Sequence, residues 1–435
     1  MNREILRLAI PNILSNLSIP LLSTVDIALM GRQEDAAYIG AIALGAVIFN
    51  FVYWSFGFLR MGTTGLTAQA YGAKSNTTII EILGRALIFA ILSSVLILLL
   101  QYPIFYVGLS LLEGSDKVET LVWTYCQIRI WDAPATLALY AFMGWFFGMQ
   151  NTIYPLILTI FINVVNIIGS YIFVYHFGMA ADGVALGTVI AQYSGLILAC
   201  ILWWYRYRSF WQYFSSKALQ NWNALQSFFL LNRDIFIRTF CLLFVIAFFQ
   251  NQSALQGDLI LAVNSVLLQF FSWVSYGIDG FAYASESLVG KYVGAKDNTN
   301  LKQSIRYSFY WGFGLAVVYC IVFAVFGTDL LFIFSDKLDI IQAAESYLIW
   351  VILLPLLAVA SFIWDGIFIG FTASKAMRDT MFLSTSFFLL SFYALMHFTT
   401  YPPNHILWFV FVSFMLIRGV IQYFWFDRLR LAVGS

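Results

Sequence analysis

The chain has 435 residues, of which 61% are hydrophobic and 10% are charged, and its formal net charge is +1. Soluble domains carry about 25% charged residues, so this composition excludes an ordinary soluble globular protein. The small net charge gives no electrostatic basis for binding nucleic acid. The apolar runs are about 20 residues long and lack the alternation of barrel strands, which indicates membrane-spanning α-helices.

Turn residues and charges divide the chain into twelve predicted spans, an even number. They cover residues 8–30, 36–60, 80–108, 120–147, 152–176, 184–205, 235–255, 259–288, 304–326, 342–370, 378–397 and 405–427.

The distribution of Lys and Arg predicts the orientation of these spans. With the N-terminus in the cytoplasm, sixteen of these residues lie in cytoplasmic segments, and only Arg32, Lys117 and Lys337 face outside. Such an excess marks the cytoplasmic side of a membrane protein. We therefore expect a multi-pass protein of the cytoplasmic (inner or plasma) membrane, with both termini in the cytoplasm.

Short sequences of the first half recur in the second half at one constant distance in residue number, from residue 72 to residue 294, which we call the repeat offset. It places Gly72-Ala73-Lys74 on Gly294-Ala295-Lys296, and it also matches Gly144 with Gly366. Two halves of six spans each enter the membrane in the same direction, as parallel repeats do. We predict an N-terminal lobe at 1–206, a cytoplasmic linker at 207–233 and a C-terminal lobe at 234–435. The aromatic and basic linker either lies in the membrane interface or forms a plain cytoplasmic loop.

Inside the first span lies an acid with no basic residue in the preceding turn, Asp26. An ionisable group inside a span costs free energy and so points to function. In the fifth span, Asn163, Asn166 and Ser170 follow spacings of three and four and share one helix face, and Thr188 lies at a similar depth. Together they predict a proton or cation site; the alternative is hydrogen bonding that only joins helices.

A second acid of the first half, Asp132, follows Arg129 by three residues, which predicts an internal ion pair. We expect Pro134 to interrupt the fourth span, because proline cannot donate a backbone hydrogen bond. Asp132 and Tyr140 are candidates for lining a substrate cavity.

The second half carries its acids toward the cytoplasmic ends of the spans. Asp279, Glu286 and Asp365 lie there, and Arg238 lies at the same depth, as do Lys291 and Arg378. This charge cluster predicts either a charge-paired gate or a second ion site.

Taken together, several fragments resemble the multidrug and toxic compound extrusion (MATE) family, in its DinF-like branch. They are Ile10-Pro11 with Val25-Asp26, Ala133-Pro134-Ala135, Gly144-Trp145, Gly148-Met149-Gln150-Asn151-Thr152, Asn163-x-x-Asn166, Asn232 to Thr239, Asp279-Gly280, Glu286-x-Leu288-Val289-Gly290 and Trp364 to Gly370. The resemblance implies an all-α polytopic membrane protein, with twelve transmembrane helices in a V-shaped pair of pseudo-symmetric six-helix lobes.

The same resemblance implies cation-driven export of organic compounds, with Asp26 as the coupling carboxylate and Asn166 and Thr188 beside it. Ser170 departs from the carboxylate that many relatives carry at this position. We therefore expect proton coupling, with sodium at Asp26, Asn166 and Thr188 as the alternative.

The predicted function is a cation-coupled antiporter that exports organic, lipophilic cationic compounds. A flippase of lipid-linked oligosaccharides or of another amphiphile, in the same superfamily, is the rival, and three or more in-span arginines lining one cavity would favour it. Catalytic motifs such as HExxH, GxSxG and a P-loop are missing from the sequence, so we expect no enzyme. We expect a monomer in the lipid bilayer with a small-molecule substrate, no nucleic acid and no cofactor beyond a proton or sodium gradient.

Overall fold

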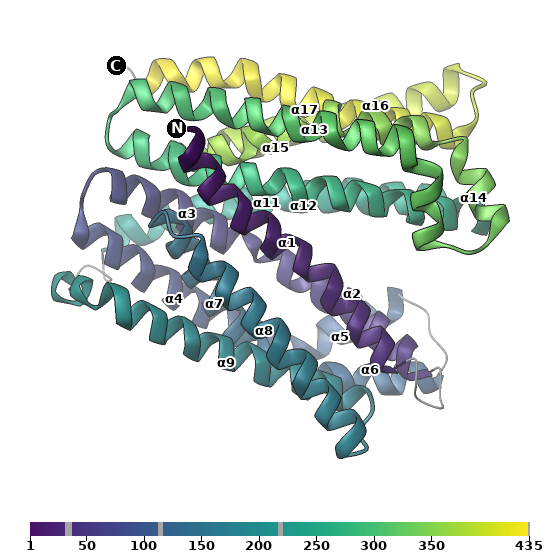
Figure 1. Ribbon diagram of the computed structural model, residues 1–435, viewed down its shortest axis with the longest axis horizontal. Coiled ribbons are helices and arrows are strands. Elements are labelled where there is room, and N and C mark those ends of the chain that lie inside the picture. Colours follow the sequence, from purple (N-terminus) through teal and green to yellow (C-terminus); the bar gives the residue numbers. More distant parts are fainter. Residues whose placement is uncertain (31–36, 112–115, 216–220, 434–435) are drawn as a thin grey trace. The chain divides into compact units, whose positions relative to one another are not determined.

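The computed structural model describes the backbone of residues 1–30, 37–111, 116–215 and 221–433, without the side chains of 19–30, 37, 39, 111, 116 and 427–433. These residues form helices and turns and contain no β-strand (Figure 1). They divide into two compact units. The N-terminal unit is Leu14–Phe229, and the C-terminal unit combines Met1–Ile13 with Leu230–Ser435.

Most spans of the N-terminal unit are interrupted helices, in which one helix ends and the next begins within a few residues. Helix α1 (Asn2–Met30) enters the unit at Leu14. The others are α2 (Ala37–Ser55), α3 (Gly57–Gly72), α4 (Asn76–Leu99), α5 (Gln101–Leu111), α6 (Asp116–Arg129), η1 (Ile130–Asp132), α7 (Ala133–Gly148), α8 (Ile153–Tyr171), η2 (Ile172–His176), α9 (Ala181–Tyr207) and η3 (Arg208–Tyr213). The short 3-10 turn η1 stands directly before Ala133-Pro134, which confirms that Pro134 interrupts the regular helix.

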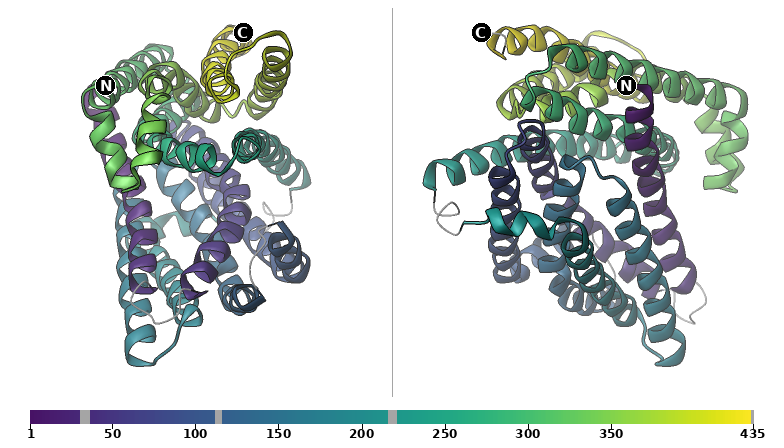
Figure 2. Two further views of the ribbon diagram at one scale, coloured as in Figure 1. Left: turned by 90° about the vertical axis from the view of Figure 1, so that its right-hand side faces the viewer. Right: turned by 60° about the vertical axis from the view of Figure 1, so that its left-hand side comes forward.

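The C-terminal unit consists mainly of long helices, and α12, α13, α15 and α17 pack as neighbours (Figure 1). Its helices are α11 (Trp222–Ala254), α12 (Asp258–Gly294), α13 (Asn298–Phe334), α14 (Leu338–Glu345), α15 (Leu348–Gly370), α16 (Ser374–Phe398) and α17 (Pro403–Val433). The last two, olive and yellow in Figure 2, stand side by side.

Each of the twelve predicted spans falls on helix. Within the described ranges, nine stretches are long and apolar enough to cross a membrane, and the other three predicted spans coincide with α1, with α6 and α7, and with α11. Several boundaries were wrong. The predicted span 342–370 merges α14 and α15, whereas the helix ends at Glu345 and resumes at Leu348.

The internal repeat is present in the backbone geometry. Lys74 and Lys296 have φ 55, while Gln150 and Thr372 have φ 60 and 54. The members of each pair are separated by the repeat offset, and each follows a helix C-terminus. The next residue donates a backbone hydrogen bond across the turn, 3.0 Å after Lys74 and Lys296 and 2.9 Å after Gln150 and Thr372. This pattern is the left-handed cap that satisfies orphan carbonyls at helix ends.

The corner after Lys296 has a further feature, since Asp297 caps helix α13. The backbone amide of Asn300 donates a hydrogen bond of 3.0 Å to the Asp297 carboxylate. This bond holds the pKa of the Asp297 carboxyl below its ordinary value, because the charged form accepts it better.

Equivalent glycines bring helix backbones together in both units. A Cβ built on Gly144 would meet the carbonyl oxygen of Arg60, and one built on Gly366 would meet that of Ala282. The four residues again obey the repeat offset. Close backbone approach at small residues is the usual way that membrane helices pack, because lipid offers no hydrophobic driving force between them.

Helix α1 is divided between the two units. Its first turns contact the C-terminal unit, where Glu4 accepts hydrogen bonds from Lys291 Nζ at 3.4 Å and Tyr292 Oη at 3.2 Å. Asn2 Oδ1 accepts a bond of 3.1 Å from Trp311. The hydropathy of the first span did not indicate that Met1–Ile13 groups with the C-terminal unit. The predicted lobe division at residues 206 and 234 stays a prediction.

We predict that Gly366→Ala destabilises the protein by about 1–3 kcal/mol, because the new methyl group meets backbone and not a movable side chain. Thermal unfolding in detergent measures the effect as a lower Tm. Gly314→Ala is the control, because no atom lies within 4 Å of a Cβ at that helical glycine. There, alanine gains up to about 1 kcal/mol of helix propensity. Equal Tm values for the two variants would contradict the close-packing argument.

Candidate functional site

A buried polar group lies where α8 packs against α9 in the N-terminal unit. Asn166 and Ser170, at 1% and 0% exposure, lie on α8, and Thr188 lies on α9. Asn166 Nδ2 donates a hydrogen bond of 2.9 Å to Thr188 Oγ1, which itself donates to the backbone carbonyl of Val184 at 3.0 Å. The structure thus joins Asn166 to Thr188, and Ser170 lies one turn after Asn166 on α8.

Two acceptors of this group remain open. Asn166 Oδ1 and Ser170 Oγ are buried and have no hydrogen-bond partner among the described residues. A buried polar atom without a partner costs about 1–3 kcal/mol, so each such atom is a candidate for contact with water, an ion or a further side chain.

Glycine explains why the two helices meet here. A Cβ on Gly187 would lie 2.8 Å from both the backbone nitrogen and the Oγ atom of Ser170, and a Cβ on Gly169 would lie 3.4 Å from the Cα of Gly187. The helices are therefore close enough for the short side chains of Ser170 and Thr188 to share one buried space.

The fourth predicted residue on this side, Asn163, joins α8 to α1. Its Nδ2 donates to Ser18, with 3.1 Å to Oγ and 3.4 Å to the backbone oxygen. Nearby, Ser15 Oγ donates to Thr159 Oγ1 at 2.9 Å. Both contacts advance in the same direction along the two helices, so α1 and α8 run parallel. The backbone of Asp26 belongs to α1, but its side chain lies outside the described residues.

Asp132 forms a separate cluster at the break between α6 and α7. It is 1% exposed, accepts a hydrogen bond from Tyr53, and lies 3.8 Å from Arg129 Nε. The predicted ion pair is confirmed. Arg129 also donates to Tyr125 and stands 4.8 Å from the centre of the Phe49 ring.

Tyr140, the other candidate for the substrate cavity, lies on α7 and is partly buried. It is close enough to Asp132 and Arg60 for electrostatic interaction. The Arg60 guanidinium also stands 5.7 Å from the centre of the Phe147 ring. The two candidates are thus neighbours, but Asp132 already has a cationic partner.

In the C-terminal unit, Asp365 is the centre of a buried charge clamp. We use this name for Asp365, Arg238, Arg418 and Gln422. Both arginines pair with Asp365 Oδ2, and Gln422 Nε2 donates to Oδ1 at 2.7 Å. All four side chains are buried. The clamp ties α15 to α11 and α17, and protein donors already occupy both oxygens of its carboxylate.

The remaining acids of the predicted cluster lie on α12. Asp279 is half-buried, accepts a bond of 3.3 Å from Ser275, and interacts electrostatically with Arg238 and Arg418. Glu286 follows two turns later on the same helix and is 1% exposed.

Lys291 and Arg378, which the sequence placed at the same depth, have partners elsewhere. Lys291 pairs with Glu4 at 3.4 Å, and Arg378 pairs with Asp234 at 2.8 Å and Asp379 at 2.7 Å.

Sequence reasoning missed two members of the clamp and one contact of Asp132. Arg418 and Gln422 were not assigned to the cluster, although their spacing of four residues places them on one helix face. An arginine and a glutamine one turn apart inside an apolar span are a usable signal for a buried carboxylate partner. Tyr53 offered no comparable signal, because aromatic residues are abundant throughout the chain.

We predict that Asp365→Asn lowers stability by about 3–5 kcal/mol, because two buried guanidinium groups lose their counter-charge. Thermal unfolding in detergent measures this loss. Asp336→Asn, at an exposed carboxylate, is the control and should leave the Tm unchanged. Replacing Asp365, Arg238 and Arg418 together by Leu, Met and Met should recover much of the loss. A single Asp365→Asn variant as stable as the native chain would refute the clamp.

Comparison with known proteins adds the family. The MatE family model matches residues 11–172 and 236–395, one match in each half of the chain. DNA damage-inducible protein F of Escherichia coli (strain K12) is 34% identical over 421 residues, which cover 96% of this chain and 90% of that protein. Multidrug and toxin extrusion protein 1 of Oryctolagus cuniculus is 27% identical over 350 residues, covering 78% of this chain and 59% of that protein.

Solved structures share the fold. One is described as the outward-facing conformation of a multidrug resistance MATE family transporter of the MOP superfamily, with a TM-score of 0.88, 16% identity, and coverage of 100% of this chain and 96% of that one. Another, from Pyrococcus furiosus, is described as a MOP superfamily transporter whose reversed binding-pocket polarity suggests a different function. It has a TM-score of 0.87, 15% identity and the same coverage. With a family match in both halves and this fold, the chain belongs to the MatE family of multi-pass membrane transporters and is not an enzyme.

Proposed function

We propose that this transporter is a proton-coupled antiporter that exports organic, lipophilic cationic compounds. The observation that carries the proposal is the open polar group of Asn166 and Ser170 together with the parallel register of α1 and α8. Residue 26 lies eight positions beyond Ser18, and residue 171 lies eight positions beyond Asn163. Both helices rise about 1.5 Å per residue, so the backbone at Asp26 is expected to be level with Ser170.

The chemistry around this level suits a carboxyl group that gains and loses a proton. Asn166, Ser170 and Thr188 are neutral, so they offer hydrogen bonds without a fixed counter-charge. Burial away from water and the open acceptor Asn166 Oδ1 favour the neutral form of a carboxyl group, whereas a hydrogen bond donated by the Ser170 hydroxyl favours the charged form. A carboxyl between these influences can change its protonation state during a transport cycle.

Proton coupling is preferred to sodium coupling because of the ligand set. A hard cation is held by several oxygens, of which carboxylates contribute most. Ser170 supplies a hydroxyl where a second carboxylate would strengthen a sodium site. Sodium bound by Asp26, Asn166 and Thr188 is the alternative that the experiment below distinguishes.

The proposed cycle uses one exchangeable charge. Facing outward, Asp26 takes a proton and changes its hydrogen bonds to the polar face of α8. Helix α1, which contains Pro11 and Pro20, then bends and releases substrate outward. The membrane potential contributes roughly 2.3 kcal/mol for each charge that moves through 100 mV.

We propose that both termini lie in the cytoplasm, because Lys and Arg are in excess on that side. The membrane that the chain spans is then the inner or plasma membrane. We propose a monomer without a cofactor, driven by the ion gradient alone. Tyr140 and the neighbouring aromatic rings are proposed to contact the substrate, since flat cations bind well to ring faces.

A flippase of lipid-linked oligosaccharides is not favoured. An anionic substrate would need a basic cavity, and the in-span arginines mostly pair with acids. Arg238 and Arg418 both contact Asp365, and Arg129 faces Asp132. No group of three arginines around one space is found among the described residues.

Transport in liposomes tests the coupling ion. When a proton gradient is imposed, a fluorescent lipophilic cation should move in the direction opposite to the protons. A sodium gradient alone should not drive this movement. Asp26→Asn should abolish this movement while leaving the protein folded, because the amide cannot exchange a proton. Asp258→Asn, an exposed acid in the first turn of α12, should transport normally. Transport driven by sodium alone, or full activity of Asp26→Asn, would overturn the proposal.

The polar group itself makes a second prediction. Thr188→Val keeps the volume of the side chain but removes the acceptor of Asn166 Nδ2, and we expect proton-driven transport to fall by about tenfold, the effect of roughly 1.4 kcal/mol. The pH at half-maximal transport should also move, which a purely structural threonine would not cause. Thr124→Val is the control, because the Thr124 hydroxyl is exposed and bonds its own helix at 3.1 Å.

A further inference from the structure

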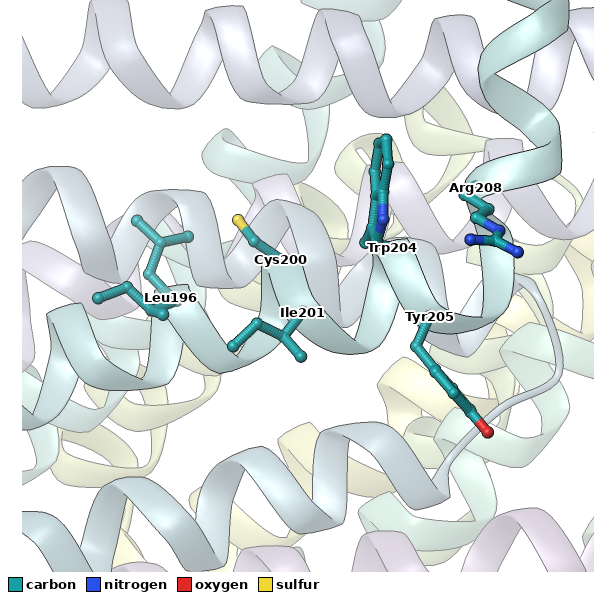
Figure 3. Close-up of a pocket in the computed structure, with 7 residues that line it drawn as sticks. Leu196, Cys200, Ile201, Trp204, Tyr205 and Arg208 are labelled. Carbon is teal, nitrogen blue, oxygen red and sulfur yellow. The ribbon is translucent and has the colours of Figure 1, made fainter.

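One side of α9 carries a groove near the C-terminal end of the helix. The groove has a volume of about 760 Å³, and α9 and the first residue of η3 form its wall (Figure 3). It is lined by Leu196, Ile197, Cys200, Ile201, Trp204, Tyr205 and Arg208. These residues recur every four positions and therefore share one helix face. From first to last, they extend over roughly 18 Å at 1.5 Å per residue.

The lining changes character along the groove. Leu196 and Ile201 are apolar, Trp204 and Tyr205 follow along the helix, and Arg208 stands at the far end (Figure 3). The seven lining residues include no acid. A phospholipid has the same order, with an acyl chain, a polar interface and a phosphate. The length also fits, because one leaflet contributes about half of the ~30 Å hydrocarbon core.

The neighbouring 3-10 helix η3 has the features expected of a segment at a membrane surface. Phe210 packs against Trp145, with ring centres 6.2 Å apart, and so anchors η3 to the core of the N-terminal unit. In the same short helix, Trp211 is 57% exposed and Tyr213 is 40% exposed. A short helix that is anchored by one aromatic ring and exposes other aromatic rings is typical of the interface between lipid and water.

We propose that the groove binds an anionic phospholipid from the leaflet on the Lys- and Arg-rich side. Its acyl chain lies along Leu196, Cys200 and Trp204, and its phosphate contacts the Arg208 guanidinium. The positive charge of Arg208, with no lining acid to neutralise it, selects an anionic over a zwitterionic headgroup. This proposal is independent of the coupling ion and of the exported substrate.

Native mass spectrometry of the detergent-purified chain tests the site. With equal amounts of phosphatidylglycerol and phosphatidylcholine, the protein should retain phosphatidylglycerol preferentially. Arg208→Gln should reduce that preference by about fivefold, the enrichment that corresponds to about 1 kcal/mol for one basic side chain near anionic lipid. Cys200→Trp should reduce retention of both lipids, because the indole fills the apolar part of the groove.

Arg306→Gln is the matched control, since it removes an exposed arginine of the C-terminal unit and should leave the preference unchanged. Size-exclusion profiles confirm that each variant is folded. An unchanged preference in Arg208→Gln, or equal retention of the two lipids by the native chain, would overturn the site and leave only unselective lipid contact.

Discussion

The close contact of helix backbones at Gly144 and Gly366 is the constraint on which both units depend. In a membrane, apolar side chains gain little by leaving lipid for a neighbouring helix, so helices must pack through geometry. The glycines allow α7 to approach the carbonyl of Arg60 and α15 to approach that of Ala282. The helices that meet at these glycines are each followed by a residue at positive φ, in both halves of the chain. The resulting caps supply hydrogen bonds to backbone carbonyl groups at the helix ends, which close packing shields from water.

On this shared backbone, the two halves carry different chemistry. Under the repeat offset, Asp365, Asp279 and Glu286 correspond to Met143, Gly57 and Thr64 of the first half. The C-terminal unit therefore has acids where the N-terminal unit has neutral residues, and two arginines of its own balance Asp365. The N-terminal unit instead has a neutral polar group, two acceptors of which have no partner in the part of the chain that the structure describes. The C-terminal half pairs its buried carboxylate with arginines that stay in place. Under the proposed function, the N-terminal half binds and releases a proton.

The spans, the repeat and the polar face of α8 were predictable because each depends on residues close in sequence. Sustained hydropathy along one segment gives a span, and spacings of three and four give a helix face. The partners of Asp365 were not predictable in the same way, because Arg238 and Arg418 reach it from two other helices. Their pairing depends on how each helix is rotated about its axis, which composition does not specify. Ser15 and Ser18 went unassigned for the same reason.

The division of α1 has a consequence for how the protein is made. The N-terminal unit is one continuous stretch of chain, whereas the C-terminal unit needs Met1–Ile13 as well as Leu230–Ser435. During synthesis, the first turns of α1 leave the ribosome long before Lys291 and Trp311, their partners through Glu4 and Asn2. The N-terminal unit can thus fold as soon as it is inserted. The beginning of the chain acquires its final neighbours only when α12 and α13 have entered the membrane.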